Sequence, residues 1–161
     1  GQLRIRRSDN VDRLAVDFAT GNVGIGTIAP TAKLHVVGDL CVTGAKNRIV
    51  DTPFGRTKFN AVESAEAWFT KGGEGRLTDG RARVDLSEHF MSAVTISPSY
   101  PLQVDVTFYG PHGNWYLERD RSGFTVIDPS GGNSDFSWRA SARQKGYETW
   151  DLKTDTDQAA R

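Results

Sequence analysis

The sequence predicts an all-β protein built from many short strands. Apolar residues alternate with polar ones along much of the chain, and this period of two is typical of strands with one buried face. Turn residues recur about every ten positions, as they do in a β-sandwich or barrel. The 161 residues include 17 glycines, well above the roughly 7% average, which also indicates many turns.

The first segment, residues 1–45, consists of short alternating runs separated by turn signals. Its predicted inner-face residues are Ile5, Leu14, Val16, Phe18, Val23, Ile25, Leu34, Val36, Leu40 and Val42. So few residues of short strands cannot build a core of their own, and isolated hairpins are marginal in water. Identical chains could supply the missing layers if these side chains pointed at a shared axis, which would also remove exposed edges. We therefore expect self-association.

The second segment, residues 46–150, is predicted to be a separate compact domain of the β-sandwich type. Its expected strands are 47–52, 59–63, 67–70, 75–78, 81–85, 94–97, 103–109, 115–119, 123–128 and 136–144. One helical turn is expected at 87–92, with Ser87 as its cap. Residues 151–161 are polar and are predicted to form a loose tail.

Composition argues against several classes of function. The formal charge is zero, with 20 basic and 20 acidic side chains, so no nucleic-acid partner is expected; the local basic group Arg4, Arg6 and Arg7 is interpreted as a solvated strand edge. Cys41 is the one cysteine, which excludes an intrachain disulfide and a cysteine-rich zinc site. No apolar run approaches the roughly 20 residues of a membrane span, so no membrane insertion is expected. The chain begins at Gly1 without an initiator Met, which favours a longer parent protein.

A longer motif covers residues 21–38, which are G-N-V-G-I-G-T-I-A-P-T-A-K-L-H-V-V-G. This stretch resembles a repeat of phage tail fibres and trimeric bacterial fibre proteins, in which G-N-V-G-I-G-T-x-x-P-x-x-K-L-H-V-x-G recurs in trimeric β-structured shafts. The resemblance implies a homotrimer and an intertwined β shaft for residues 1–45. It also implies a virion tail fibre, or an extracellular phage-like particle such as a contractile injection device. The shaft geometry implied by the resemblance is either a triple β-helix or a stack of triangular sheets.

The distal segment resembles a tip domain found at the C-terminal end of such fibre proteins. The residues that carry this likeness include N-A-V-E-S at 60–64, G-E-G-R-L at 73–77, G-F-T-V at 123–126 and F-S-W-R at 136–139. The resemblance implies a β-sandwich-like tip that follows the shaft. It assigns no catalytic or ligand-binding residue.

No motif for catalysis or cofactor binding in this sequence is complete. Gly24-x-Gly26-x-x-Ala29 superficially fits a dinucleotide fingerprint, but Pro30 follows at once and the next residues alternate as a strand, where the fingerprint needs a helix. The three histidines, His35, His89 and His112, show no metal-binding spacing. His35 is expected to point away from the apolar face, because its neighbours on both sides are apolar. No nucleophile-elbow pattern occurs. We therefore expect no cofactor, no metal and no enzymatic activity.

Polar and aromatic residues near predicted loops are the candidates for receptor contact, because loops at the end of a sandwich commonly carry binding. These candidates are Tyr100, His112, Asn114, Asn133 and Asp135. The favoured function is attachment of a phage or phage-like particle to a cell-surface receptor, either a protein or, preferentially, a glycan. A structural trimerisation and capping domain without receptor binding is the alternative. A polysaccharide-degrading enzyme is the least favoured of the three.

Overall fold

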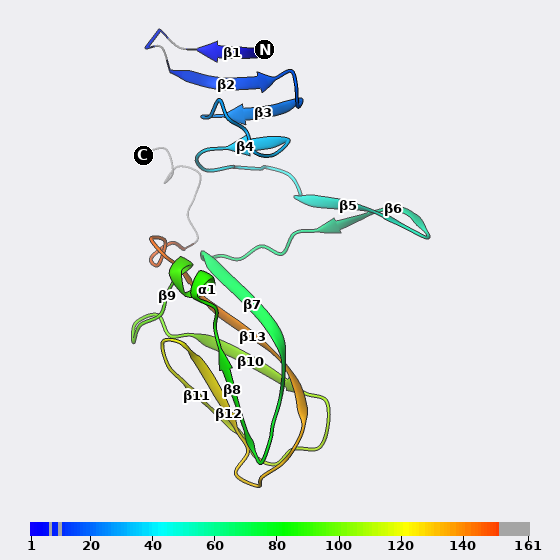
Figure 1. Cartoon of the computed structure of the whole chain (residues 1–161), viewed down its shortest axis with the longest axis vertical. Coiled ribbons are helices and arrows are strands. Elements are labelled where there is room, and N and C mark those ends of the chain that lie inside the picture. Colours follow the sequence, from blue (N-terminus) through cyan, green and yellow to red (C-terminus); the bar gives the residue numbers. More distant parts are fainter. Residues whose placement is uncertain (7, 10, 152–161) are drawn as a thin grey trace. The chain divides into compact units, whose positions relative to one another are not determined.

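The computed structural model describes residues 1–6, 8–9 and 11–151 (Figure 1). It contains 48% strand and 4% helix, which confirms the all-β class. The chain divides into two compact units, the first being Gly1–Val62 and the second beginning at Glu63. The sequence placed this boundary after residue 45, and the difference is one hairpin that belongs to the first unit. Arg7 of the predicted basic edge and all of the predicted tail beyond residue 151 lie outside the described residues.

The first unit contains a four-stranded sheet with the order β1-β2-β3-β4. Its strands are β1 (Gln2–Arg6), β2 (Asp12–Asp17), β3 (Asn22–Ile25) and β4 (Leu34–Val36). The first three pair antiparallel, whereas β4 pairs parallel to β3. Because parallel neighbours need a crossover, the chain between β3 and β4 must pass over one face of the sheet.

The register of this sheet gathers its aliphatic side chains on one face, since directly paired residues point to the same side. Two rows cross all four strands, the first being Ile5, Leu14, Ile25 and Val36, and the second Leu3, Val16, Val23 and Leu34. We call this set of eight residues the apolar face. The alternation in the sequence thus becomes a continuous aliphatic surface.

The crossover, residues 26–33, packs against the opposite face of the sheet at Ala15 and Gly24. Ala15 is fully buried there, and Gly24 beside it is buried as well. A Cβ at Gly24 would lie 2.2 Å from the carbonyl oxygen of Thr27, so only glycine lets the loop approach this closely. The Nε2 of Gln2 also donates a hydrogen bond to the carbonyl of Ile28 at 2.9 Å. The middle of this face is therefore covered within the chain, whereas Arg4 on the same face stays exposed.

A separate hairpin completes the first unit. Strands β5 (Asn47–Thr52) and β6 (Gly55–Asn60) form a two-stranded sheet of their own. None of the described residues from 41 to 65 is buried. The alternating run at 40–42, predicted to continue the sheet, forms no strand in the described structure, because β4 is the last strand of that sheet.

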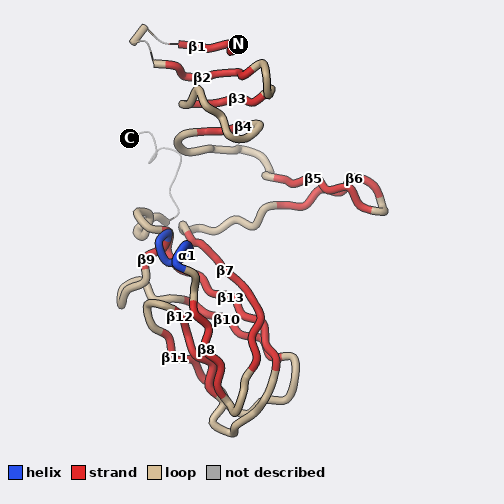
Figure 2. Tube along the Cα trace, viewed as in Figure 1, coloured by secondary structure: helices blue, strands red, loops and turns tan. Residues whose placement is uncertain are grey.

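The second unit consists of two antiparallel sheets, whose strands are labelled β7 to β13 in Figure 2. One has the order β10-β13-β7 with β9 added to β13, and the other has the order β11-β12-β8. The bounds are β7 (Trp68–Arg76), β8 (Arg81–Asp85), β9 (Val94–Thr95), β10 (Gln103–Phe108), β11 (Tyr116–Arg119), β12 (Gly123–Ile127) and β13 (Asp135–Gln144). The predicted strands 67–70 and 75–78 are wrong as separate elements, because β7 runs through the glycines between them.

One hydrophobic core joins the two sheets. Phe124 of β12 and Phe136 of β13 are fully buried, and both belong to the same cluster of packed residues. The ring of Phe124 also meets the indole of Trp138 edge-on, with 5.5 Å between ring centroids. Because the inner faces of both sheets contribute to this cluster, the unit is consistent with the predicted β-sandwich.

The single helix of the described chain, α1 (Glu88–Ala93), links β8 to β9. Ser87 has an extended backbone and its side chain accepts a hydrogen bond from the amide of Phe90. This confirms the predicted helical turn and its cap. Phe90 and Met91 pack against the sandwich core, which fixes the helix over the end of the sheets.

Candidate functional site

Three loops meet at one end of the sandwich, and they contain most of the predicted receptor residues. The strand registers explain the meeting: Phe108 lies opposite Phe136, and Ile127 lies opposite both Arg81 and Tyr116. The segments that leave these strand ends are 77–80, 109–115 and 128–134. We call these three segments the loop cluster.

The carboxylate of Asp128 holds the loop cluster together. Its side chain is 2% exposed, and one oxygen accepts hydrogen bonds from the amide and hydroxyl of Ser130. The other oxygen accepts from the amide of Gly113 at 2.8 Å, and the backbone amide of Asp128 donates to the carbonyl of Gly80 at 2.8 Å. One residue thereby bonds to both other segments of the cluster. The Ser130 hydroxyl first, and the Gly113 amide next, hold the pKa of Asp128 below its usual range.

Further hydrogen bonds join the loops to each other. The amide of Gly80 donates to the carbonyl of Gly132 at 3.0 Å, and the amide of Asp79 donates to the side-chain oxygen of Asn133 at 3.2 Å. The carboxylate of Asp135 pairs with the guanidinium of Arg76 at 2.7 Å. The loop cluster is therefore a bonded frame with fixed geometry.

The structure brings four of the five predicted receptor residues to this end of the sandwich. These four exposed residues are His112, Asn114, Asn133 and Asp135. Two of them are already engaged, because Asn133 accepts a hydrogen bond from Asp79 and Asp135 pairs with Arg76. The ring of His112 lies against Phe108, with 4.4 Å between ring centroids. His112 and Asn114 are thus the side chains best placed to contact another molecule.

Tyr100 is not part of this group. It lies in the loop before β10, whose first residue Gln103 pairs with Ser141, whereas the loop cluster follows the other end of β10. The amides and carbonyls of Ser97 and Tyr100 bond reciprocally at 3.0 and 3.1 Å, so that loop is also fixed. Tyr100 and the loop cluster thus lie at opposite ends of β10. The separation depends on the pairing of β10 with β13, which the sequence alone does not reveal.

Sequence reasoning missed Asp128, the residue on which the loop cluster depends. The signal was present as Asp128-Pro129-Ser130-Gly131, because an Asp at the start of such a stretch commonly bonds its own backbone two residues on. The hydrogen bond from the Ser130 amide to the Asp128 carboxylate at 2.9 Å is that interaction. The additional bond to Gly113 is non-local and could not be inferred.

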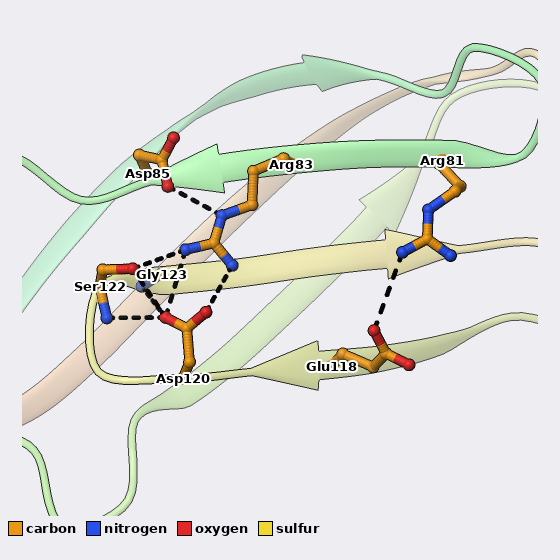
Figure 3. A network of polar contacts seen from close by, with 7 residues as sticks. All are labelled: Arg81, Arg83, Asp85, Glu118, Asp120, Ser122 and Gly123. Atoms are coloured by element: carbon orange, nitrogen blue, oxygen red, sulfur yellow. Dashed lines mark hydrogen bonds and ion pairs between the residues drawn. The ribbon is translucent and has the colours of Figure 1, made fainter.

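A second polar network lies on the outer face of the β11-β12-β8 sheet (Figure 3). The guanidinium of Arg83 binds both carboxylate oxygens of Asp120, at 2.9 and 3.2 Å, and its Nε binds Asp85 at 2.8 Å. Asp120 also accepts from the amides of Ser122 and Gly123. These bonds, that from Arg83 first, hold the pKa of Asp120 far below its usual range. A carboxylate so occupied clamps the β11–β12 turn and is unsuited to acid–base catalysis.

The apolar face of the first unit is partly exposed in the described structure. Ile5 is 57% exposed and Leu34 53% exposed. Seven of the ten predicted axis residues lie on this face, together with Leu3. Phe18 follows the end of β2, and Leu40 and Val42 lie beyond the last strand of the sheet. His35, paired with Gly24, points to the opposite side as expected.

Other classes of site find little support in the described part of the chain. No group of three or more His, Cys, Asp or Glu residues among the described residues could hold a metal ion. The described helix is too short to cross a membrane. Arg4 and Arg6 both pair with Asp12, at 3.5 and 2.9 Å, in keeping with a solvated strand edge.

The two features that stand out are thus the open apolar face and the rigid loop cluster. The first can bury aliphatic surface against another molecule, and the second presents exposed polar side chains on a fixed frame. The sequence matches no protein-family model and no curated protein.

Proposed function

We propose that this chain is the C-terminal tip of a trimeric tail-fibre-like protein, which attaches a phage or phage-like particle to a cell-surface glycan. The observation that carries the proposal is the apolar face: eight aliphatic side chains in two rows, of which Leu3, Ile5, Ile25 and Leu34 are exposed in the described structure. A surface of this kind marks a site of association. The crossover, residues 26–33, packs on the other face of the same sheet over Ala15 and Gly24, and the exposed side chain of Arg4 on that face is charged.

Burial of the exposed side chains of the apolar face would stabilise an assembly. Leu3, Ile5, Ile25 and Leu34 are between 41% and 57% exposed, and burying the exposed half of one such side chain contributes about 1 kcal/mol. Three copies arranged about an axis would cover each other's apolar faces and close the assembly. The number three follows from the resemblance of residues 21–38 to a trimeric fibre repeat.

Attachment is supported by the loop cluster at the end of the sandwich. His112 and Asn114 are exposed, and the segment that carries them is tied to Asp128 through the Gly113 amide. A fixed loop loses little entropy when it binds. A trimer would display three such loop clusters, and multivalency can raise avidity by ~10²–10⁴ without new contacts.

Light scattering during size-exclusion chromatography tests the assembly. We expect a mass near three times 17.7 kDa for the natural chain and a monomer for Ile25→Asp, because the variant places charges in a buried interface. Ile28→Asp is the matched control. Ile28 is 43% exposed, against 41% for Ile25, but lies in the crossover on the other side of the sheet. A monomeric natural chain, or an Ile25→Asp variant that keeps its mass, would refute the trimer.

Binding of the labelled trimer to host cells tests the attachment. The variant His112→Ala with Asn114→Ala is expected to lose most of the cell-bound signal. His89→Ala is its control, because His89 is also exposed but lies on α1, away from the loop cluster. If the double variant at His112 and Asn114 gives the same cell-bound signal as the natural trimer, the loop cluster is not the attachment site. A trimer that binds no host cell would favour the structural capping role.

A further inference from the structure

A cavity of about 250 Å³ opens at the end of the sandwich opposite the loop cluster. It lies between the segment before β10 and the turn that joins β11 to β12. The lining residues are Ile96, Ser97, Pro98, Pro101, Leu102, Arg119, Asp120 and Arg121. Pockets for drug-sized ligands usually measure roughly 300–1,000 Å³, so this cavity suits one small ring.

Both walls of the cavity are preorganised. On one side, the reciprocal backbone bonds between Ser97 and Tyr100 and the two prolines fix the chain. On the other side, Asp120 is clamped by the bidentate contact with Arg83. A ligand would therefore enter a formed site with little ordering of the protein.

The floor is apolar and the rim is cationic. Ile96 supplies half-buried aliphatic surface, and the neighbouring lining residue Leu102 is almost fully buried at 1% exposure. Arg119 donates one hydrogen bond to the carbonyl of Leu102, which ties its guanidinium to the other wall of the cavity. Arg121 makes no hydrogen bond or ion pair with any residue of the described chain, and it is exposed. The one acidic lining residue, Asp120, already has both oxygens bonded to Arg83.

We propose that this cavity binds a sugar ring that carries a carboxylate, such as the hexuronate unit of an acidic glycan. The C–H face of a pyranose is apolar and would lie on Ile96 and the prolines. The carboxylate would meet Arg119 and Arg121, because a guanidinium offers several donors in the fork geometry that a carboxylate accepts. That the sugar belongs to a cell-surface glycan rests on the proposed function. The binding of a carboxylate-bearing sugar ring by this cavity is independent of that function.

The test is a titration of the full chain with D-glucuronate, followed by saturation-transfer NMR of the sugar. We expect saturable binding in the millimolar range, and binding of D-glucose about tenfold weaker, because glucose lacks the group that forms charge-assisted bonds. Arg121→Gln should weaken glucuronate binding about tenfold, with Arg121→Lys intermediate, since it keeps the charge but not the fork. Arg121 is exposed, so these variants are expected to fold.

The matched control is Arg139→Gln, which removes the same charge from an exposed position on β13, away from the cavity. It should leave glucuronate binding unchanged. Absence of saturable binding, equal binding of glucose, or equal weakening by Arg139→Gln would each overturn the proposal. The titration does not require a trimer. A monomer that binds glucuronate would thus refute the fibre assembly alone, and a trimer that attaches to cells without binding glucuronate would refute this site alone.

Discussion

Gly75 lies directly opposite Phe136 in the β7–β13 ladder, and a Cβ at Gly75 would lie 2.4 Å from the Cζ atom of that ring. Phe136 is fully buried in the sandwich core and cannot move aside without displacing its neighbours. Gly75→Ala should therefore lower the free energy of unfolding by about 1–3 kcal/mol, the usual cost of overpacking a core. Urea unfolding monitored by tryptophan fluorescence measures the change.

Gly44→Ala is the control for this substitution, because a Cβ at Gly44 would meet nothing within 4 Å. Its effect on the unfolding of the sandwich should be within about 0.5 kcal/mol. A Gly75→Ala variant as stable as Gly44→Ala would show that the ring of Phe136 is not packed as described.

Asp128→Asn should make the sandwich less stable at pH 7 but less sensitive to acid. The folded pKa of Asp128 lies below that of an unfolded aspartate, which is about 3.9. The carboxylate therefore stabilises the fold above that value, and the stabilisation is lost as the pH falls through the folded pKa. Urea midpoints at pH 7 and pH 3 should show a gap between natural chain and variant that narrows in acid.

The control for Asp128 is Asp105→Asn, which removes the same charge from an exposed position on β10. Its urea midpoint should follow that of the natural chain at both pH values. A gap for Asp128→Asn that stays constant from pH 7 to pH 3 would contradict the role given to the carboxylate.

Ser87→Ala should destabilise the sandwich by about 1 kcal/mol, the typical cost of losing a helix cap. The Ser87 hydroxyl accepts from the Phe90 amide and from the Nζ of Lys71, at 3.4 and 3.0 Å. Ser92→Ala in the same helix is the comparison, and it should be neutral or slightly stabilising because alanine is the better helix former. Equal effects of the two substitutions on thermal unfolding would refute the cap.

Two arginines of β8 should differ although both form ion pairs on the same sheet (Figure 3). Arg81 meets Glu118 at 3.8 Å with both side chains about 60% exposed, so Arg81→Ala should change stability by less than about 0.5 kcal/mol. Arg83→Ala should cost clearly more, since it releases both Asp85 and Asp120. Urea unfolding of the two variants side by side provides the measurement, and equal losses would contradict this ranking.

Local patterns in the sequence were sufficient for many elements of the fold. The strands at 47–52 and 81–85 have the predicted bounds, and the helix begins after Ser87 as its capping pattern indicates. The predicted break between 70 and 75 is wrong, because β7 continues through its glycines. In the structure two of them, Gly73 and Gly75, lie opposite Trp138 and Phe136, whose rings take the space of the missing side chains. That requirement comes from a strand some sixty residues away and is invisible locally.

The sequence predicts which face of a strand a side chain occupies, but not which loops and strand ends meet in the fold. Period-two alternation identified residues of the apolar face such as Val23 and Ile25, because side-chain direction follows from local geometry. The separation of Tyr100 from His112 could not be foreseen, since it depends on which strand ends meet. The sequence does not identify Arg119 and Arg121 as binding residues. They line a cavity only because the turn beside them lies against residues 96–102 in the fold.

The anchoring of the loop cluster by Asp128 has a consequence for how this surface can change. The frame is made by a buried carboxylate and by backbone groups at positions such as 80 and 113, whereas the side chains of His112 and Asn114 are exposed. Substitutions at 112 and 114 can therefore alter what the surface recognises while the scaffold below stays folded. Such a division lets specificity diversify rapidly, and positions 112 and 114 are the natural choice for a randomised library selected against new targets.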